Sequence, residues 1–422
     1  MASRQIHQNP SQEGGRRLIF FWHAVWIGDW QGSRLPDQLP VIAPEKEAFV
    51  GKEQGRIHEY LKDKVVLLTG GTGSFGRHFT KVLTERFAFK ALRIFSRDEL
   101  KQYEMRRRFG DDRIRYLIGD VRDPSRLDRA MQGVDVVIHA AAMKQVPACE
   151  YNPFEAVRTN VLGAQNVVDA AIDHQVHRGI GISSDKAVSP ANLYGATKLC
   201  AEKIFVQGNA YAAKRSTRFS CVRYGNVLGS RGSVVPVFLE QRRTGRITVT
   251  DPRMTRYWLT LEQAIQFVLR CLAGAKGGEV FIPRIPSMRI VDVVPVVAPG
   301  CEVDIVGIRP GEKLHETLIT EDESRHTLEY EDMFRIMPEY NEWGAPEGNG
   351  NGNGNGHGGR PLPDGFKYSS ETNTQWLTAE GLRSLLVVSG YGEQLEARDQ
   401  EGRVEKRNGA ARKHSLRPAL AR

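Results

Sequence analysis

From Val65 onward, short apolar runs rich in β-branched residues alternate with longer stretches in which apolar residues recur at helical spacing. The short runs predict buried strands, and the longer stretches predict amphipathic helices. Strands and helices that alternate in this way predict an α/β protein with a parallel, doubly wound sheet, because parallel strands need long crossovers. The expected strands are Val65–Thr69, Leu92–Ser96, Arg115–Ile118, Val134–His139, Arg178–Ser184 and Phe219–Tyr224.

A glycine motif follows the first expected strand. Gly70, Gly73 and Gly76 form the pattern GxxGxxG between that strand and a helical stretch. Glycine permits a tight turn and lets the backbone approach a pyrophosphate, while the next helix offers free N–H groups. A plain glycine-rich turn has the same letters, but a strand before it and a helix after it favour a dinucleotide site. The expected fold is therefore a Rossmann-type doubly wound parallel sheet with a smaller C-terminal substrate-binding part.

The end of the second expected strand indicates which dinucleotide binds. NAD-specific proteins place an acidic side chain on the ribose 2′-hydroxyl about 20 residues after the glycines. Here the strand ends in Ser96-Arg97, and Lys101 follows one turn later. A hydroxyl and a guanidinium suit a 2′-phosphate, so the sequence favours NADP, although Asp98 would serve the ribose if Arg97 pointed away. Gly119–Val121 would meet the adenine, and Ala140–Ala142 are small enough to admit the cofactor.

Changes in composition divide the chain into segments. The first 62 residues show no helical or strand period, and the run GNGNGNGNGHGG cannot bury a core. The expected segments are 1–62, a poorly ordered N-terminal extension; 63–230, mainly the NADP-binding domain; 231–345, mainly the substrate-binding part; 346–365, a flexible insertion; 366–390, a return to the core; and 391–422, a basic tail.

Charge and hydrophobicity exclude several classes of partner. The net charge is +9, but seven basic residues against one acid between Arg403 and Arg422 account for +6, which argues against a nucleic-acid partner. The apolar run Leu18–Ile27 is about half of the roughly 20 residues that a membrane helix needs, and no small-residue cleavage site follows it. The five cysteines form no CxxC pair and fit a reducing compartment. We therefore expect a cytoplasmic protein with no membrane, metal or nucleic-acid partner.

A second motif has the chemistry for proton transfer. Tyr194 and Lys198 form Tyr-x-x-x-Lys, and this spacing places both side chains on one face of a helix. A tyrosine pKa near 10 makes a poor base at neutral pH, but a nearby ammonium and a cationic nicotinamide would lower it. The pair could then remove a hydroxyl proton while hydride leaves. The spacing is frequent by chance, and its position just after the fifth strand favours the functional interpretation.

Ser184, Asp185 and Lys186 close the fifth expected strand. In doubly wound sheets, ligands bind at the edge where the strands end. An acid and an amine placed side by side there could serve as proton donor and base. The alternative is a solvated surface ion pair, and the proximity to Tyr194 favours a catalytic role.

At these residues the chain resembles the extended short-chain dehydrogenase/reductase family of nucleotide-sugar enzymes, and most closely its inverting UDP-N-acetylglucosamine 4,6-dehydratases. The likeness runs from about residue 63 to 337 and resumes at 366–386, whereas residues 1–60, the insertion and the tail have no counterpart. The stretches that carry it are TGGTGSFGRHF, FSRDELKQYEMRRRF, GDVRD, HAAAMKQVPACEYNPFEAVRTNVLGAQNV, SSDKA, NLYGATKLCAEK, RYGNVLGSRGSVVPVF, MTRYWLTLEQA, GEVFIPRIPSM, GIRPGEKLHE and YSSETNTQWLT.

The resemblance implies a mechanism. Tyr194, aided by Lys198, would deprotonate the C4 hydroxyl as hydride leaves C4 for NADP. Lys186 would remove the C5 proton, and Asp185 would protonate the departing C6 hydroxyl. Hydride return to C6 and reprotonation of C5 from the opposite face would invert C5, in what the family implies is the first step of pseudaminic acid synthesis. Retaining sugar dehydratases carry Asp-Glu here, so the inverting assignment depends on Lys186, while Ser184 keeps the hydroxyl of the family's usual threonine.

The resemblance also completes the sets of expected contacts and implies a homo-oligomer, since related enzymes associate through helices of this domain. Arginine suits the diphosphate of a UDP-sugar, although each arginine could instead form a surface ion pair. The expected substrate contacts are Lys144, Lys186, Asn226, Val234, Arg256, Arg309 and Glu312. The expected cofactor contacts are Gly70, Thr72, Gly73, Ser74, Phe75, Gly76, Ser96, Arg97, Asp98, Glu99, Leu100, Lys101, Asp120, Val121, Ala140, Ala142, Lys144, Tyr194 and Lys198.

Two other functions share these motifs. A C4 epimerase, or a dehydratase that continues as a 3,5-epimerase, would use the same cofactor site and Tyr194. The Asp185-Lys186 pair and the GEVFIPRIPSM and RPGEKLHE stretches favour the dehydratase. A non-catalytic NADP-binding regulator would typically lack the tyrosine–lysine pair. A nucleic-acid role would depend on the basic tail alone.

Overall fold

The computed structural model describes residues 44–212, 216–229, 233–340, 343 and 358–396. The chain divides into two units, 1–50 and 51–422, and the packing discussed below belongs to the second unit. In the first unit, the described residues are the beginning of helix α1 (Pro44–Leu61). The apolar run Leu18–Ile27, the basic stretch Arg403–Arg422 and most of the glycine/asparagine run lie outside the described residues.

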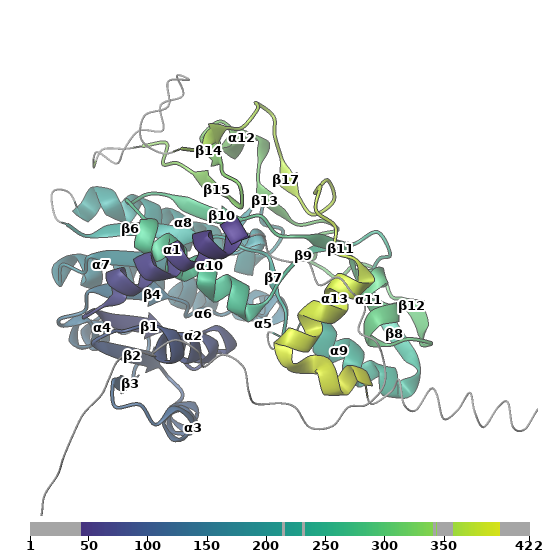
Figure 1. Cartoon of the computed structure of the whole chain (residues 1–422), viewed down its shortest axis with the longest axis horizontal. Coiled ribbons are helices and arrows are strands. Elements are labelled where there is room, and N and C mark those ends of the chain that lie inside the picture. The colour runs from purple at the N-terminus through teal and green to yellow at the C-terminus, as the bar shows by residue number, and fades with distance from the viewer. Residues whose placement is uncertain (1–43, 213–215, 230–232, 341–342, 344–357, 397–422) are drawn as a thin grey trace, which may run out of the picture. The chain divides into compact units, whose positions relative to one another are not determined.

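A large sheet lies at the centre of the second unit (Figure 1). Its parallel strands follow the order β3-β2-β1-β4-β5-β6-β10, and the antiparallel strands β15, β14 and β16 extend it past β10. All six strands expected from the sequence are present, so the predicted Rossmann-type fold is confirmed. The strands are β1 (Val65–Thr69), β2 (Ala91–Ser96), β3 (Ile114–Ile118), β4 (Val136–His139), β5 (Arg178–Ile182), β6 (Arg218–Val222), β10 (Val280–Pro283), β14 (Thr327–Glu329), β15 (Met333–Ile336) and β16 (Arg360–Pro361).

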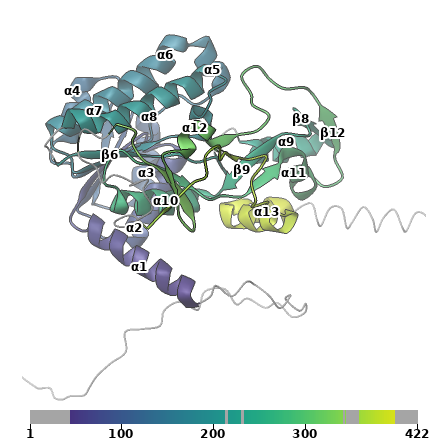
Figure 2. The same cartoon turned by 90° about the horizontal axis from the view of Figure 1, so that it is seen from above.

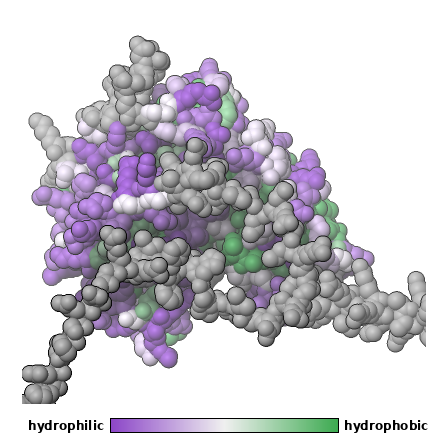
Figure 3. Space-filling model, viewed as in Figure 1, coloured by the Kyte–Doolittle hydropathy of each residue, from purple (hydrophilic) through white to green (hydrophobic). Residues whose placement is uncertain are grey.

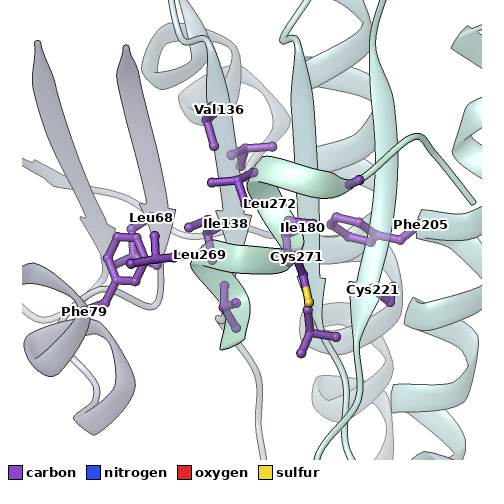
Figure 4. Packing of buried hydrophobic residues seen from close by; sticks show 14 of the residues in the cluster. Leu68, Phe79, Val136, Ile138, Ile180, Phe205, Cys221, Leu269, Cys271 and Leu272 are labelled. Atoms are coloured by element: carbon purple, nitrogen blue, oxygen red, sulfur yellow. The ribbon is translucent and has the colours of Figure 1, made fainter. Parts of the chain in front are cut away.

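Helices cover both faces of this sheet, as Figure 2 shows. On one face lie α4 (Pro124–Met131), α7 (Gly163–Asp173) and α8 (Leu193–Ala212), and on the other lie α2 (Ser74–Arg86) and α10 (Leu261–Gly274). Leu269 and Leu272 of α10 face Leu68 and Ile138 of the sheet (Figure 4), and all four side chains are fully buried. Burying apolar surface between these layers is the main driving force for the fold. Helix α3 (Glu99–Phe109) follows β2.

Helix α1 corrects one expectation. The sequence predicted a poorly ordered extension over 1–62, but Ile57 and Leu61 of α1 are buried in the main core. The guanidinium carbon of Arg178 lies over the Tyr60 ring, 4.6 Å from the centre of that ring. The helix was missed because Gly51 and Gly55 interrupt it and its apolar positions do not form a full stripe.

A second, smaller cluster of buried apolar residues is formed by the C-terminal part of the chain, from Leu228 onward. It is built from α9 (Val234–Gln241), β8 (Arg246–Val249), α11 (Ile290–Val297), β12 (Glu302–Ile305) and α13 (Ala379–Leu386). The residues between these elements return to the large sheet as β10 and β15, so the expected part 231–345 is interleaved with the Rossmann body. Within the expected insertion 346–365, residues 360–361 form β16, and from the expected tail Leu395 packs into this cluster.

Short elements connect the two clusters. Strands β7 (Asn226–Val227), β9 (Thr255–Leu259) and β11 (Ser287–Arg289) form one small sheet, and β13 (Thr317–Ile319) pairs with β17 (Tyr368–Ser369) in another. The chain after the insertion therefore pairs, through β17, with a strand that precedes the insertion. The remaining short helices are α5 (Val146–Tyr151), α6 (Pro153–Val157), α12 (Glu321–Ser324), η1 (Arg158–Leu162), η2 (Asp185–Ala187), η3 (Arg242–Thr244) and η4 (Val387–Tyr391).

The surface is polar over most of the face drawn in Figure 3, with apolar residues gathered beside α13. Val387 and Val388, which follow α13, are exposed apolar residues. Within the described ranges, no helix combines the length and apolar character that crossing a bilayer requires.

The burial of α1 yields a first test. Leu61→Ala should lower the free energy of unfolding by about 2–5 kcal/mol, because the side chain is fully buried and its removal leaves a cavity. Gln54→Ala, at an exposed position on the same helix, should change it by about 0.5 kcal/mol or less. Urea unfolding of both variants is the measurement. Equal midpoints for Leu61→Ala and wild type would show that α1 does not contribute to the folded core.

Candidate active site

The glycine turn after β1 is shaped for close backbone approach. Gly70 has φ +68°, and a Cβ placed on it would lie 2.8 Å from the backbone nitrogen and Cα of Ala141. A Cβ on Gly76 would lie 2.2 Å from the carbonyl oxygen of Gly71. Only glycine fits both positions. The turn brings the end of β1 against the end of β4, where the order of the parallel strands reverses and such folds bind ligands.

A cavity of about 350 Å³ opens at this point. Ten of the expected cofactor residues line it, whereas Ser74, Phe75, Gly76, Glu99, Leu100, Ala140, Lys144, Tyr194 and Lys198 do not. Phe95 and Thr159 line it without having been expected; Phe95 is the last apolar residue of β2, and Thr159 lies in η1 and carried no motif. The full lining is Gly70, Thr72, Gly73, Phe95, Ser96, Arg97, Asp98, Lys101, Gly119, Asp120, Val121, Ala141, Ala142 and Thr159.

Polar groups at the end of β2 shape one end of the cavity. The Ser96 and Thr72 hydroxyls lie 3.0 Å apart, and the Arg97 guanidinium lies 3.7 Å from the Asp120 carboxylate. Asp98 caps α3 by accepting a hydrogen bond from the backbone N–H of Lys101 at 2.9 Å, and it also pairs with the Lys101 ammonium. The side chain that could have served a ribose hydroxyl is thus engaged as a helix cap, while Arg97 is largely exposed beside the cavity.

The cavity fits a dinucleotide. The glycine turn forms a cradle that a Cβ would fill, and the N-terminus of α2 follows it directly. Among the described residues, the buried Thr159 hydroxyl has no hydrogen-bond partner although it lines the cavity. An orphaned buried hydroxyl in a cavity wall is well explained by a polar ligand that would satisfy it.

A cluster of charged side chains follows the end of β5. Lys186, in η2, places its Nζ 3.0 Å from Oδ2 of Asp185, 3.0 Å from Oδ1 of Asn226 and 3.3 Å from Oε1 of Glu316. Asp185 also accepts a hydrogen bond from the Ser184 hydroxyl at 2.8 Å. The structure therefore brings together Ser184, Asp185, Lys186 and Asn226 as expected. Glu316 was missed, because it lies 130 positions away and its signal was membership of the GIRPGEKLHE stretch without a role of its own.

Burial and neighbouring charges shift the pKa values of this cluster. Burial raises the pKa of Asp185, against the opposing effect of the Lys186 ammonium. Burial alone would lower the pKa of Lys186, but the Asp185 and Glu316 carboxylates outweigh it and raise it. Burial would raise the pKa of Glu316, yet the charges of Lys186, Arg256 and Lys313 together lower it. The two carboxylates beside one ammonium are thus shifted in opposite directions.

The pKa of Tyr194 differs from expectation. Burial raises this pKa to about 12, despite the opposing effects of the Lys186 charge and a hydrogen bond with Ser184. The expected lowering by Lys198 is not seen: its ammonium donates a hydrogen bond to the Ile182 carbonyl oxygen at 2.6 Å, and burial lowers its own pKa. The Tyr-x-x-x-Lys spacing therefore placed both residues correctly on α8, but burial outweighs the lowering of the Tyr194 pKa that was predicted from the lysine, and the lowering predicted from the nicotinamide stays a prediction.

The expected substrate residues fall into two groups. Arg256 is buried in β9 next to the Lys186 cluster, and it donates hydrogen bonds to the carbonyl oxygens of Thr255, Leu314 and Lys313 at 2.7–3.0 Å. Its guanidinium also lies 3.6 Å from Glu312. Lys144 and Arg309 are exposed, and Val234 begins α9, so the structure places these three residues without adding them to the cluster.

Comparison with known proteins gives the family. The model of a family described as polysaccharide biosynthesis protein matches residues 66–338. The chain belongs to this family. It is 49% identical over 325 residues to a Campylobacter jejuni protein named UDP-N-acetylglucosamine 4,6-dehydratase (inverting), covering 76% of this chain and 97% of that relative. The resemblance inferred from the motifs is thereby confirmed.

Two further relatives bear on the fold and on the alternatives. The crystal structure of Pen from Bacillus thuringiensis has 39% sequence identity and a TM-score of 0.70, and the match covers 78% of this chain and 98% of that one. A Rickettsia massiliae protein named UDP-glucose 4-epimerase is 40% identical over 290 residues, covering 65% of this chain and 83% of the relative. Relatives of this chain therefore bear the names of two different reactions.

The glycine turn can be tested with a matched pair of variants. Gly70→Ala should weaken dinucleotide binding about tenfold or more, a change of about 1.4 kcal/mol, because the added Cβ collides with the Ala141 backbone. Gly110 also has a positive φ, +56°, but Gly110→Ala has no atom within 4 Å of the added Cβ, so it should cost only about 1–2 kcal/mol of stability and leave binding unchanged. Calorimetric titration distinguishes the two. Unchanged affinity in Gly70→Ala would show that the dinucleotide does not bind at this turn.

Proposed function

We propose that the protein is an NADP-dependent inverting 4,6-dehydratase of UDP-N-acetylglucosamine, which removes water across C5 and C6 and inverts C5. The product would be a UDP-4-keto-6-deoxy-N-acetylhexosamine, the first intermediate of pseudaminic acid synthesis. The observation that carries the proposal is the Lys186 ammonium in contact with the buried Asp185 carboxyl at the end of β5. The 49% identity to a relative of that name supports it.

The chain's own residues can perform the proton transfers. Bound NADP would supply the redox chemistry, accepting the C4 hydride and later returning it to C6. Tyr194 would take the proton of the C4 hydroxyl as its phenolate, a form that the positive charge of a bound nicotinamide would favour, and Ser184 is placed to bond both Tyr194 and Asp185. The 4-ketone makes the C5 proton acidic, and the Lys186 amine would take it.

Asp185 and Lys186 share one exchangeable proton, and its position decides their roles. With that proton on Asp185, the carboxyl is an acid and the amine of Lys186 is a base. As the C5–H bond breaks, its proton passes to Lys186 and a C5–C6 double bond forms. As the C6–O bond breaks, the hydroxyl takes the Asp185 proton and leaves as water. The raised pKa of Asp185 suits this donor role.

The cofactor assignment rests on the end of β2. Arg97 lies beside the cavity, while Asp98 is engaged in capping α3. A guanidinium at this point suits a 2′-phosphate better than a 2′-hydroxyl. We further infer a cytoplasmic protein, since the five cysteines are free thiols, as a reducing compartment would keep them. The homo-oligomer is inferred from the family resemblance alone.

Product analysis tests the reaction. Wild-type protein incubated with UDP-N-acetylglucosamine and NADP should give a 4-keto-6-deoxy sugar with inverted C5 by NMR. Lys186→Ala should still bind NADP but lose product formation by about a hundredfold or more, because the base for C5 is gone. Lys203→Ala, an exposed lysine on α8, is the matched control and should retain activity. A simple C4 epimer from the wild type would instead support the epimerase alternative.

Cofactor preference has its own test. Arg97→Ala should weaken NADP binding about tenfold or more, because a charge-assisted hydrogen bond to phosphate is worth about 1.5–3 kcal/mol. The affinity for NAD, which lacks that phosphate, should stay nearly constant and serves as the control. Titration of both dinucleotides against wild type and variant gives the ratio. An equal loss for the two would contradict the assignment of Arg97 to the 2′-phosphate.

A further inference from the structure

Glu316 is a buried carboxylate at the centre of the charged cluster. It lies directly before β13, and its side chain is 3% exposed. Its Oε1 lies 3.3 Å from Nζ of Lys186 and 3.7 Å from Nε of Arg256, and its Oε2 lies 3.7 Å from Nζ of Lys313. A charge removed from water in this way is costly unless other charges compensate it. Three cations from three parts of the chain supply that compensation.

The backbone of Glu316 is held as firmly as its side chain. Its N–H donates a hydrogen bond to the Ser370 hydroxyl oxygen at 2.9 Å, and its carbonyl oxygen accepts one from the Ser370 N–H at 2.7 Å. The Ser370 hydroxyl in turn lies 2.7 Å from that of Thr255 in β9. Three segments that are distant in sequence therefore fix where this carboxylate lies.

The balance of charges gives Glu316 a role. Lys186, Arg256 and Lys313 supply positive charge, and Asp185 and Glu316 supply negative charge next to Lys186. When Asp185 carries the shared proton for the leaving hydroxyl, Asp185 and the Lys186 amine are both neutral. Among the described residues that contact Lys186, Glu316 then provides the remaining anion.

We propose that Glu316 is a positioning residue for the dehydration, the permanent anion that holds Lys186 in place and leaves Asp185 free to carry and release a proton. This inference rests on the function proposed above. Glu316 acts through Lys186 and Asp185 and needs no contact with the sugar itself.

The directions of the pKa shifts agree with this division of roles. The pKa of Glu316 is lowered, so it stays ionised, whereas burial raises the pKa of Asp185. Two carboxyl groups whose environments push their pKa values apart can serve as fixed charge and as acid, respectively. The Glu316 charge itself raises the pKa values of both Asp185 and Lys186.

The sign of the expected pH effect follows from those contributions. Activity requires Asp185 protonated and Lys186 neutral, so the pH profile is a bell with one limb from each group. Glu316→Gln removes a charge that raises both pKa values, and both limbs should therefore move to lower pH. The variant leaves the other charges around the cluster unchanged. These are Arg256 in β9 and Lys313 in the segment before β13.

The experiment compares pH profiles of turnover for wild type, Glu316→Gln and Glu316→Asp. The maximum should move by about one pH unit to lower pH in Glu316→Gln, as expected for loss of a charge within about 4–6 Å. On the alkaline limb its turnover should fall about tenfold. Glu316→Asp keeps the charge, and its maximum should stay near that of wild type. Glu371→Gln, which removes an exposed carboxylate paired with His315 nearby, should leave the profile unchanged.

The outcomes separate the two proposals. If wild type forms no 4-keto-6-deoxy sugar, the proposed function fails whatever the variants do. If wild type is active and Glu316→Gln retains its pH maximum, or loses turnover equally at every pH, the role of Glu316 is refuted and the reaction stands. Thermal unfolding and NADP titration of each variant identify any loss of folded protein, and Glu316→Asp provides the test should Glu316→Gln not fold.

Discussion

Parallel pairing of the central strands is the constraint on which the site depends. Strands in register as parallel neighbours all end at the same edge, so residues that follow them meet there although the chain separates them widely. The glycine turn follows β1, Arg97 follows β2, and Asp185-Lys186 follow β5. An antiparallel arrangement of the same strands would send alternate ends to opposite edges and disperse these groups.

The local parts of this arrangement could be read from the sequence, and the long-range parts could not. Apolar periodicity located strands β1 to β6, and motif spacing located Tyr194, Lys198, Asp185 and Lys186. These signals work because each depends on residues within one element. Helix α1 escaped because two glycines break its pattern and its burial depends on partners elsewhere, such as Arg178. Its packing is a tertiary effect that a local period does not encode.

Electrostatics were the least predictable feature. A neighbouring lysine predicted a lowered pKa for Tyr194, but the sequence does not encode how deeply a side chain is buried, and burial raises that pKa to about 12. Glu316 shows that the sequence also does not encode which distant charges come close to a motif. Its proximity to Lys186 arises from contacts between β13 and η2, which join segments 130 positions apart. Charge on an isolated motif is thus a weak guide to its protonation, because distant segments supply charged neighbours such as Glu316 and Arg256.

The two hydrogen bonds between Ser370 and Glu316 give residues 358–396, the last stretch that the structure describes, an unusual status. Residues 358–396 carry an edge strand, helix α13 with two buried leucines, and the anchor of the Glu316 carboxylate, yet they are covalently joined to the preceding chain only through the glycine/asparagine run. The stretch packs against the preceding part of the chain largely through non-covalent contacts, including the pair of hydrogen bonds to Glu316. A chain divided at that run would place Ser370 and Glu316 on separate fragments, so the anchoring of the carboxylate would depend on how tightly the two fragments associate.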